Sequence, residues 1–103
     1  MSGYLFSPQA AGDVFEIWSY IARESVDAAN RVEAAIFDAC DLLAKFPGSG
    51  HFRQDLTERP LRFWTLSRYS KYMVVYRPET VPLQIVAVLH GRRNLPRILK
   101  SRP

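Results

Sequence analysis

The residues best suited to chemistry gather in the second half of the chain, where basic and aromatic side chains alternate with apolar ones. They are Arg62, Arg68, Tyr72, Tyr76, Arg77, His90, Arg92 and Arg93. Histidine exchanges protons near neutral pH and arginine stabilises charge on phosphate oxygens, so His90 with Arg62, Arg68, Arg77 and Tyr72 would suit a metal-free ribonuclease. Arginine and tyrosine also anchor protein interfaces. The residue types therefore leave catalysis and partner binding both open.

Other chemistries find little support in the sequence. The two histidines, His51 and His90, lie on different predicted elements, and no run of Asp, Glu or Cys stands near either at ligand spacing. A glycine-rich phosphate loop is missing as well. We therefore expect no metal site and no cofactor. The single cysteine, Cys40, is predicted to pack as a small apolar side chain.

The segment "HGRR", residues 90–93, is the junction between an apolar run and a basic tail. Gly91 is expected to supply a positive φ or a bulge after the strand. His90 also fits a purely structural strand end, and the charges of Arg92 and Arg93 also fit a solvated surface. Trp18 and Trp64 are interpreted first as core or interface residues.

Charge divides the chain into two unlike halves. Residues 1–50 hold three Lys or Arg and seven Asp or Glu, whereas residues 51–103 hold eleven and three, which gives the whole chain a net charge of +4. A clustered positive charge favours an anionic partner, either nucleic acid or an acidic protein segment. A length of 103 residues suits one domain, with residues 91–103 as a basic tail. No membrane-length apolar run or leader is recognised, so we expect a cytoplasmic protein.

Two helices are predicted in the first half. A short strand at 3–6 stops at Ser7 and Pro8, a favourable helix start, and the first helix should end near residue 24. Its expected apolar face consists of Ala11, Val14, Phe15, Trp18, Ile21 and Ala22, with Asp13, Glu16 and Arg23 on the remaining surface. After Ser25 a second helix continues to "PGSG" at 47–50. The two helices should form an antiparallel hairpin.

Three strands are predicted at 61–67, 71–77 and 83–90, joined by connections short enough for hairpins. The fold class is therefore α+β: an N-terminal strand, an antiparallel helical hairpin and a three-stranded antiparallel meander. This order places His90 near Lys71 and Tyr72, with Arg68 in the adjoining turn. Both faces of the first two strands are apolar, so either the connecting loop and the tail or a bound partner must cover the second face.

Four segments together resemble the ParE branch of the RelE/ParE superfamily of bacterial toxins. They are "LFSPQAAGDVFEIWSYIA", "LLAKFPGSG", "LRFWTLSRYSKYMVVYRP" and, most distinctive, "IVAVLHGRRNLPRIL". The likeness runs from about residue 4 to residue 99. The family fold is a strand, a helical hairpin and a three-stranded meander, the arrangement that periodicity predicts.

The resemblance implies a type II toxin, associated with plasmid stabilisation and growth arrest. Its implied first partner is an acidic, partly disordered antitoxin that folds on binding, and its implied contacts are Trp18, Trp64, Tyr72, Val74 and Tyr76. ParE-like members inhibit DNA gyrase, a role we assign to Arg92, Arg93 and Arg97, with direct nucleic-acid binding less favoured. RelE-like members are ribosome-dependent mRNA endoribonucleases, which is the alternative. An inactive module that only binds antitoxin is a further alternative.

The sequence favours gyrase inhibition over mRNA cleavage. Ribonuclease members carry a dense lysine and arginine set with a terminal tyrosine or histidine pair. This chain has only three lysines, places Gly91 after His90, and has no tyrosine after Tyr76. The leading hypothesis is therefore a gyrase-binding toxin that catalyses no reaction. If the chain is an enzyme, we expect a metal-independent endoribonuclease.

Overall fold

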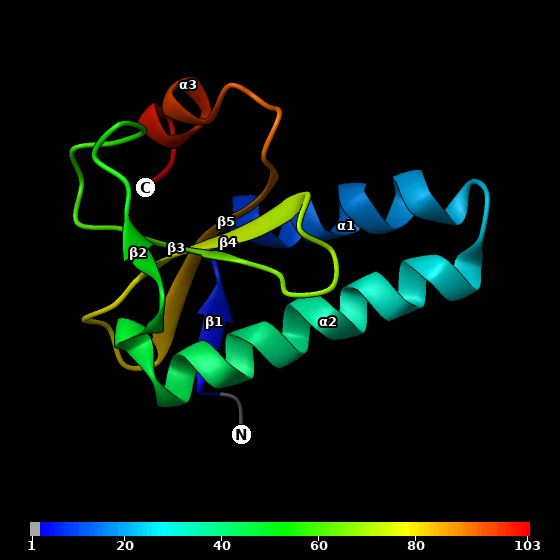
Figure 1. Ribbon diagram of the computed structural model, residues 1–103, viewed down its shortest axis with the longest axis horizontal. Coiled ribbons are helices and arrows are strands. Elements are labelled where there is room, and N and C mark those ends of the chain that lie inside the picture. Colours follow the sequence, from blue (N-terminus) through cyan, green and yellow to red (C-terminus); the bar gives the residue numbers. More distant parts are fainter. Residues whose placement is uncertain (1–2) are drawn as a thin grey trace.

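A computed structural model describes residues 3–103, and its elements form one five-stranded sheet with helices on both faces (Figure 1). In chain order the elements are β1 (Tyr4–Phe6), α1 (Pro8–Ala22), α2 (Val26–Lys45), the 3-10 turn η1 (Pro47–Ser49), β2 (His51–Phe52), β3 (Arg62–Thr65), β4 (Tyr72–Arg77), β5 (Leu83–His90) and α3 (Leu95–Lys100). The predicted α+β class is confirmed.

The sheet has the order β1-β5-β4-β3-β2. β3, β4 and β5 are consecutive antiparallel neighbours, as predicted, and β1 pairs in parallel with β5 from Tyr4 opposite Leu83 to Phe6 opposite Ile85. β2 was not predicted from the sequence, in which its residues fall within a polar connection. A strand of two residues is too short to carry an alternating pattern.

Both predicted helices are present and begin at the expected serines. The Ser7 hydroxyl accepts a hydrogen bond from the Ala10 amide at 3.1 Å, and the Ser25 hydroxyl accepts one from the Ala28 amide at 3.1 Å. These bonds satisfy amides that have no partner within the helix. The helices pack as a hairpin along one face of the sheet (Figure 1).

The predicted buried face of α1 is wrong in part. Asp13, expected on the surface, is only 6% exposed, whereas Phe15, expected in the apolar face, is 69% exposed. The buried positions are Ala10, Asp13 and Val14, so the stripe is rotated by about one residue. Asp13 is tolerated inside because its carboxylate is ion-paired and hydrogen-bonded.

Two apolar clusters lie on opposite faces of the sheet. The helical hairpin covers the first cluster, which includes Ile36, Val74 and Ile85. The second includes Phe63 and Val75 and is completed by Leu61 and Leu56 of the connecting loop and by Leu95, Ile98 and Leu99 of α3. The connecting loop and the tail therefore cover this face, which is one of the two alternatives expected from the sequence. No helix within residues 3–103 meets the length and apolarity that a membrane crossing requires.

The expectation for Gly91 is wrong. Gly91 has no positive φ, and the irregularity in the β4–β5 ladder lies between Val75 and Tyr76, where Val75 pairs with Ala87 and Tyr76 with Ile85. Val86 is therefore the extra residue. As a result Val86 and Ala87 both belong to the second cluster, and Val88 returns to the first.

Candidate functional site

The chain turns sharply after β5, and backbone hydrogen bonds fix that turn. The Gly91 amide donates to the Lys71 carbonyl at 2.8 Å, and the Arg93 amide donates to the His90 carbonyl at 3.1 Å. The Arg92 amide donates to Nδ1 of His90 at 3.1 Å. The imidazole is thus part of the turn itself. Arg92 and Arg93 project from a rigid frame rather than from a loose tail.

A pocket of about 490 Å³ opens beside this turn, between the end of the sheet and α1. Tyr72 and His90 are cross-strand partners, and their rings meet edge to face with centroids 5.5 Å apart. The other lining residues are Asp13, Glu16, Ile17, Tyr20, Lys71, Val88, Arg92 and Arg93. Burial, and secondarily the nearby Tyr20, raise the pKa of Tyr72, so its phenol stays protonated at neutral pH.

The cations around the pocket are free to engage an anion. Arg92 is exposed. Within residues 3–103, the one ion pair of Arg93 is with Glu16, with 4.0 Å between Nη1 and Oε2 and both side chains more than half exposed. Such a pair contributes little because solvent screens it. Arg97 lies exposed on α3, the element that follows the turn. The arrangement is suited to binding a carboxylate or phosphate group at the surface.

Of the residues considered for ribonuclease chemistry, only His90 and Tyr72 come together. Arg62 lies opposite Tyr76 of β4, whereas His90 lies opposite Tyr72 at the start of that strand. At about 3.3 Å per residue, Tyr76 and Arg77 are about 13 and 16 Å along β4 from Tyr72. Arg62 donates to the Gly50 carbonyl at 2.7 Å and stacks over the Phe52 ring.

The other two arginines of that set are likewise directed elsewhere. Arg77 donates to the Pro103 carbonyl, which holds the tail. Arg68 lines a separate groove beneath α2, so its expected place near His90 is not observed in the pocket lining. The predicted catalytic set is therefore spread over three parts of the surface.

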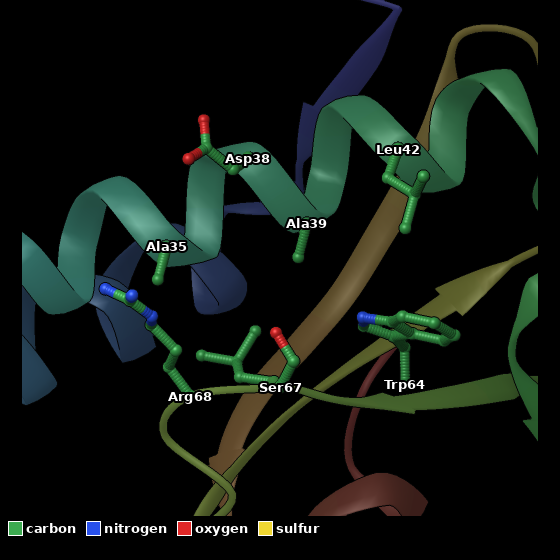
Figure 2. A pocket seen from close by; sticks show the side chains of 8 residues that line it. Ala35, Asp38, Ala39, Leu42, Trp64, Ser67 and Arg68 are labelled. Atoms are coloured by element: carbon green, nitrogen blue, oxygen red, sulfur yellow. The ribbon is translucent and has the colours of Figure 1, made fainter.

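The expected antitoxin contacts also lie in different environments. Val74 and Tyr76 have no exposed surface, so in this conformation they offer none to a partner. Trp18 is half-buried and donates its indole N–H to Oδ1 of Asn30 at 2.9 Å, which ties α1 to α2. Trp64 is half-buried in the groove beneath α2 (Figure 2). Of the five residues, Trp64 and Tyr72 stand beside surface pockets.

The buried ion pair of Asp13 and Arg102 was not predicted from the sequence. The two residues form two bonds of 2.8 Å each, and Oδ2 of Asp13 also accepts the Val88 amide at 3.0 Å. Arg102 further donates to the Val86 carbonyl at 3.1 Å. One signal was available, since Asp13 occurs within the spacing Ala10, Val14, Ile17 of the buried stripe. The pair anchors the end of the tail against α1 and β5.

Residues 3–103 contain no candidate metal site, because no three His, Cys, Asp or Glu side chains lie together there. Cys40 is fully buried, and this burial raises the pKa of its thiol to about 12. A thiol with such a pKa is neither a nucleophile nor a ligand at neutral pH.

The helical hairpin on the sheet, with a basic turn after the last strand, is the architecture of the RelE/ParE-like toxins. Residues 4–95 match the profile of the family described as "ParE toxin of type II toxin-antitoxin system, parDE". A curated relative from Sinorhizobium fredii (strain NBRC 101917 / NGR234), named "Putative toxin Y4kP", is 33% identical over 84 residues, which is 82% of each chain. The chain belongs to the ParE toxin family, which confirms the resemblance seen in its sequence.

Proposed function

We propose that this toxin-family chain acts in the cytoplasm by binding and inhibiting DNA gyrase, and that a cognate antitoxin neutralises it. The observation that carries the proposal is the rigid turn His90–Arg93, which presents Arg92 and Arg93 outside the core of a ParE-family protein. Arg97 on α3 extends the same basic surface. Exposed arginines on a fixed frame suit an interface because little side-chain and backbone freedom is lost on binding.

Binding without catalysis agrees with the positions of the remaining basic residues. A phosphodiester cleavage site needs its proton-transfer groups and its charge-stabilising groups around one phosphate. Here Arg62 and Arg77 make their hydrogen bonds at the other end of β4 from His90. The basic turn is left as a recognition element.

The test is a gyrase supercoiling and DNA-cleavage assay with the purified chain. Inhibited supercoiling that a co-purified antitoxin reverses would support the proposal. Replacing Arg92 and Arg93 together by alanine should reduce inhibition by at least about tenfold. The matched control replaces exposed Arg23, just after α1, and exposed Arg31, on α2, by alanine and should retain full inhibition. Unaltered gyrase activity with the unsubstituted chain would refute the proposed target.

The contact between His90 and Tyr72 supports a second candidate function, mRNA cleavage on the ribosome. A histidine beside a protonated phenol is able to move a proton. Primer-extension mapping of messages in growth-arrested cells tests this candidate. New cleavage ends that disappear with His90→Ala would establish the nuclease, whereas their absence together with unaffected gyrase would indicate a module that only binds antitoxin.

A further inference from the structure

The turn after β5 uses three backbone amides, and one of them is held by a side chain. The Gly91 amide donates to the Lys71 carbonyl at 2.8 Å, so this bond joins main-chain groups. The Arg93 amide donates to the His90 carbonyl at 3.1 Å, again within the main chain. The Arg92 amide lies between them and donates to Nδ1 of His90 at 3.1 Å. Of these three acceptors, the imidazole nitrogen is the one that a substitution removes.

This bond fixes a peptide group that is otherwise free to rotate. It runs from a side chain to the amide two residues further on, as in the Asx-turns closed by Asn and Asp. The residue that it spans is Gly91, and glycine has the widest backbone freedom. Without the bond, the peptide between Gly91 and Arg92 would take several orientations. The direction in which Arg92 leaves the turn therefore depends on His90.

No positive φ requires a glycine at position 91. Gly91 lies outside the left-handed region. A Cβ at this position would meet Cε of Met73 at 3.6 Å and the Lys71 carbonyl oxygen at 3.7 Å, which are ordinary contacts. Alanine would therefore fit here and would restrict the same peptide group from the backbone side.

The imidazole ring is held in place by contacts other than this bond. Tyr72 lies opposite His90 across the β4–β5 ladder. The two rings meet edge to face, with centroids 5.5 Å apart and an angle of 89° between their planes. Because His90 is also half-buried, little side-chain freedom is lost when Nδ1 accepts the amide.

The bond also specifies how the ring is protonated. A backbone amide only donates, so Nδ1 must keep its lone pair and the ring proton belongs on Nε2. An imidazole with protons on both nitrogens loses this acceptor. The ionisable groups that line the same pocket as His90 are Asp13, Glu16 and Tyr20 of α1, Lys71 and Tyr72 at the start of β4, and Arg92 and Arg93 of the turn. A proton taken up on Nδ1 would therefore open the turn.

We propose that His90 is a positioning residue of the basic turn: its unprotonated Nδ1 holds the Arg92 amide, so that Arg92 and Arg93 meet the target in one orientation. In this role the imidazole exchanges no proton with the target, unlike the proton transfer that mRNA cleavage would require of it. The effect on binding rests on the proposed gyrase function. The effect on the turn does not.

Two substitutions separate the ring from its nitrogen in the gyrase supercoiling assay. His90→Phe keeps an aromatic ring beside Tyr72 and removes the acceptor. His90→Asn removes the ring and keeps an oxygen that accepts the amide two residues further on. The phenylalanine variant should inhibit about fivefold less, as expected for one lost hydrogen bond, and the asparagine variant should stay within about twofold of the unsubstituted chain.

A second substitution tests whether His90 acts through the backbone. Gly91→Ala added to His90→Phe should recover at least about twofold of the lost inhibition, because alanine restricts the released peptide. A proton-transfer role predicts no such recovery. Equal inhibition by His90→Phe and His90→Asn, whether retained or lost, would overturn the positioning role.

Nuclear magnetic resonance of the isolated chain tests the turn without gyrase, and the spectra verify that each variant is folded. The nitrogen chemical shifts of His90 should show an unprotonated Nδ1 at neutral pH. Protection of the Arg92 amide, relative to its intrinsic exchange rate, should fall about fivefold in His90→Phe and persist in His90→Asn. In the unsubstituted chain this protection should fall over the pH range in which Nδ1 gains its proton, whereas in His90→Asn it should not.

The two measurements fail in different ways. A protonated Nδ1 at neutral pH, or an Arg92 amide equally protected in His90→Phe, would overturn the role of the imidazole in the turn. Unaltered gyrase activity with the unsubstituted chain, beside a protected Arg92 amide, would refute the target and leave the turn as described.

Discussion

The carboxylate of Asp13 accepts hydrogen bonds beside the part of β5 that β1 does not reach. β1 pairs with β5 only as far as Ile85, so the Val88 amide beyond it would lack a partner without Asp13. The hydrogen bond from Arg102 to Asp13 raises the pKa of Arg102, so this guanidinium stays protonated throughout the physiological range. Because both side chains are largely buried, removing one leaves an unpaired charge in the interior.

We therefore expect Asp13→Ala to lower the free energy of unfolding by about 3 kcal/mol, as measured by urea denaturation. Arg102→Ala should cost a similar amount, and the double variant should cost less than the two single effects together. Glu16→Ala serves as the control, since that carboxylate is exposed and only weakly paired. A loss below about 1 kcal/mol for Asp13→Ala would show that the pair contributes little.

The buried thiol of Cys40 makes the free energy of unfolding depend on pH in the alkaline range. Its folded pKa of about 12 lies above the ordinary value of 9.0, so the unfolded chain loses this proton first as the pH rises. Stability is thus fully present below pH 9 and declines above it. Between pH 8 and pH 10 the unsubstituted chain should lose about 1.4 kcal/mol more than Cys40→Ala. Denaturant titrations at the two pH values measure this, and parallel losses would contradict it.

At the scale of elements, α3 is a structural part of the sheet's second face and not only a basic tail. Leu99 is 1% exposed in the second cluster, and Arg59 donates to the Leu99 and Arg102 carbonyls at 2.9 and 2.8 Å. Leu99→Ala should therefore lower the unfolding free energy by about 3 kcal/mol. Lys100→Ala, one residue further and exposed, should change it little. Equal stability of the two variants in guanidinium chloride would show that α3 is dispensable.

Elements with strong local signals were predictable, and those defined by distant contacts were not. Ser7 and Ser25 mark helix starts through bonds within one turn, so the sequence around them suffices. β2 exists only because Phe52 meets Arg62 across a connection with no pattern of its own. The placement of Asp13 depends on Arg102, which is 89 residues away in the chain. Periodicity alone carries no information on such pairs.

The candidate site follows the same division. Antiparallel order was enough to bring His90 to Tyr72, because register follows from short hairpins. It was not enough to place Arg68, which leaves β3 into a turn and lies in the groove beneath α2. Likewise the burial of Val74 and Tyr76 depends on the helical hairpin above them, which the strand pattern does not reveal. Cross-strand pairing was thus easier to predict than the position of a residue in a turn or the layer that covers a strand.

At the scale of the whole molecule, charge separation follows the layers. The acidic half of the sequence forms the helical hairpin, and the basic half forms β2 to β5 and the tail, with a net charge of +4 for the chain. Figure 1 shows the hairpin on one side of the sheet and α3 on the other. An acidic partner is therefore attracted to one side of the molecule before any close contact forms.

This separation predicts that the association rate with the antitoxin depends on salt. Raising NaCl from about 0.05 to 0.5 M should lower the association rate constant by about tenfold, because screening shortens the range of attraction from roughly 14 to 4 Å. Replacing Arg92 and Arg93 by glutamate should weaken this dependence, whereas the same change at Arg23 and Arg31, on the acidic half, should weaken it less. Stopped-flow tryptophan fluorescence measures the rate. A constant rate across this range would mean that apolar contacts alone guide the encounter.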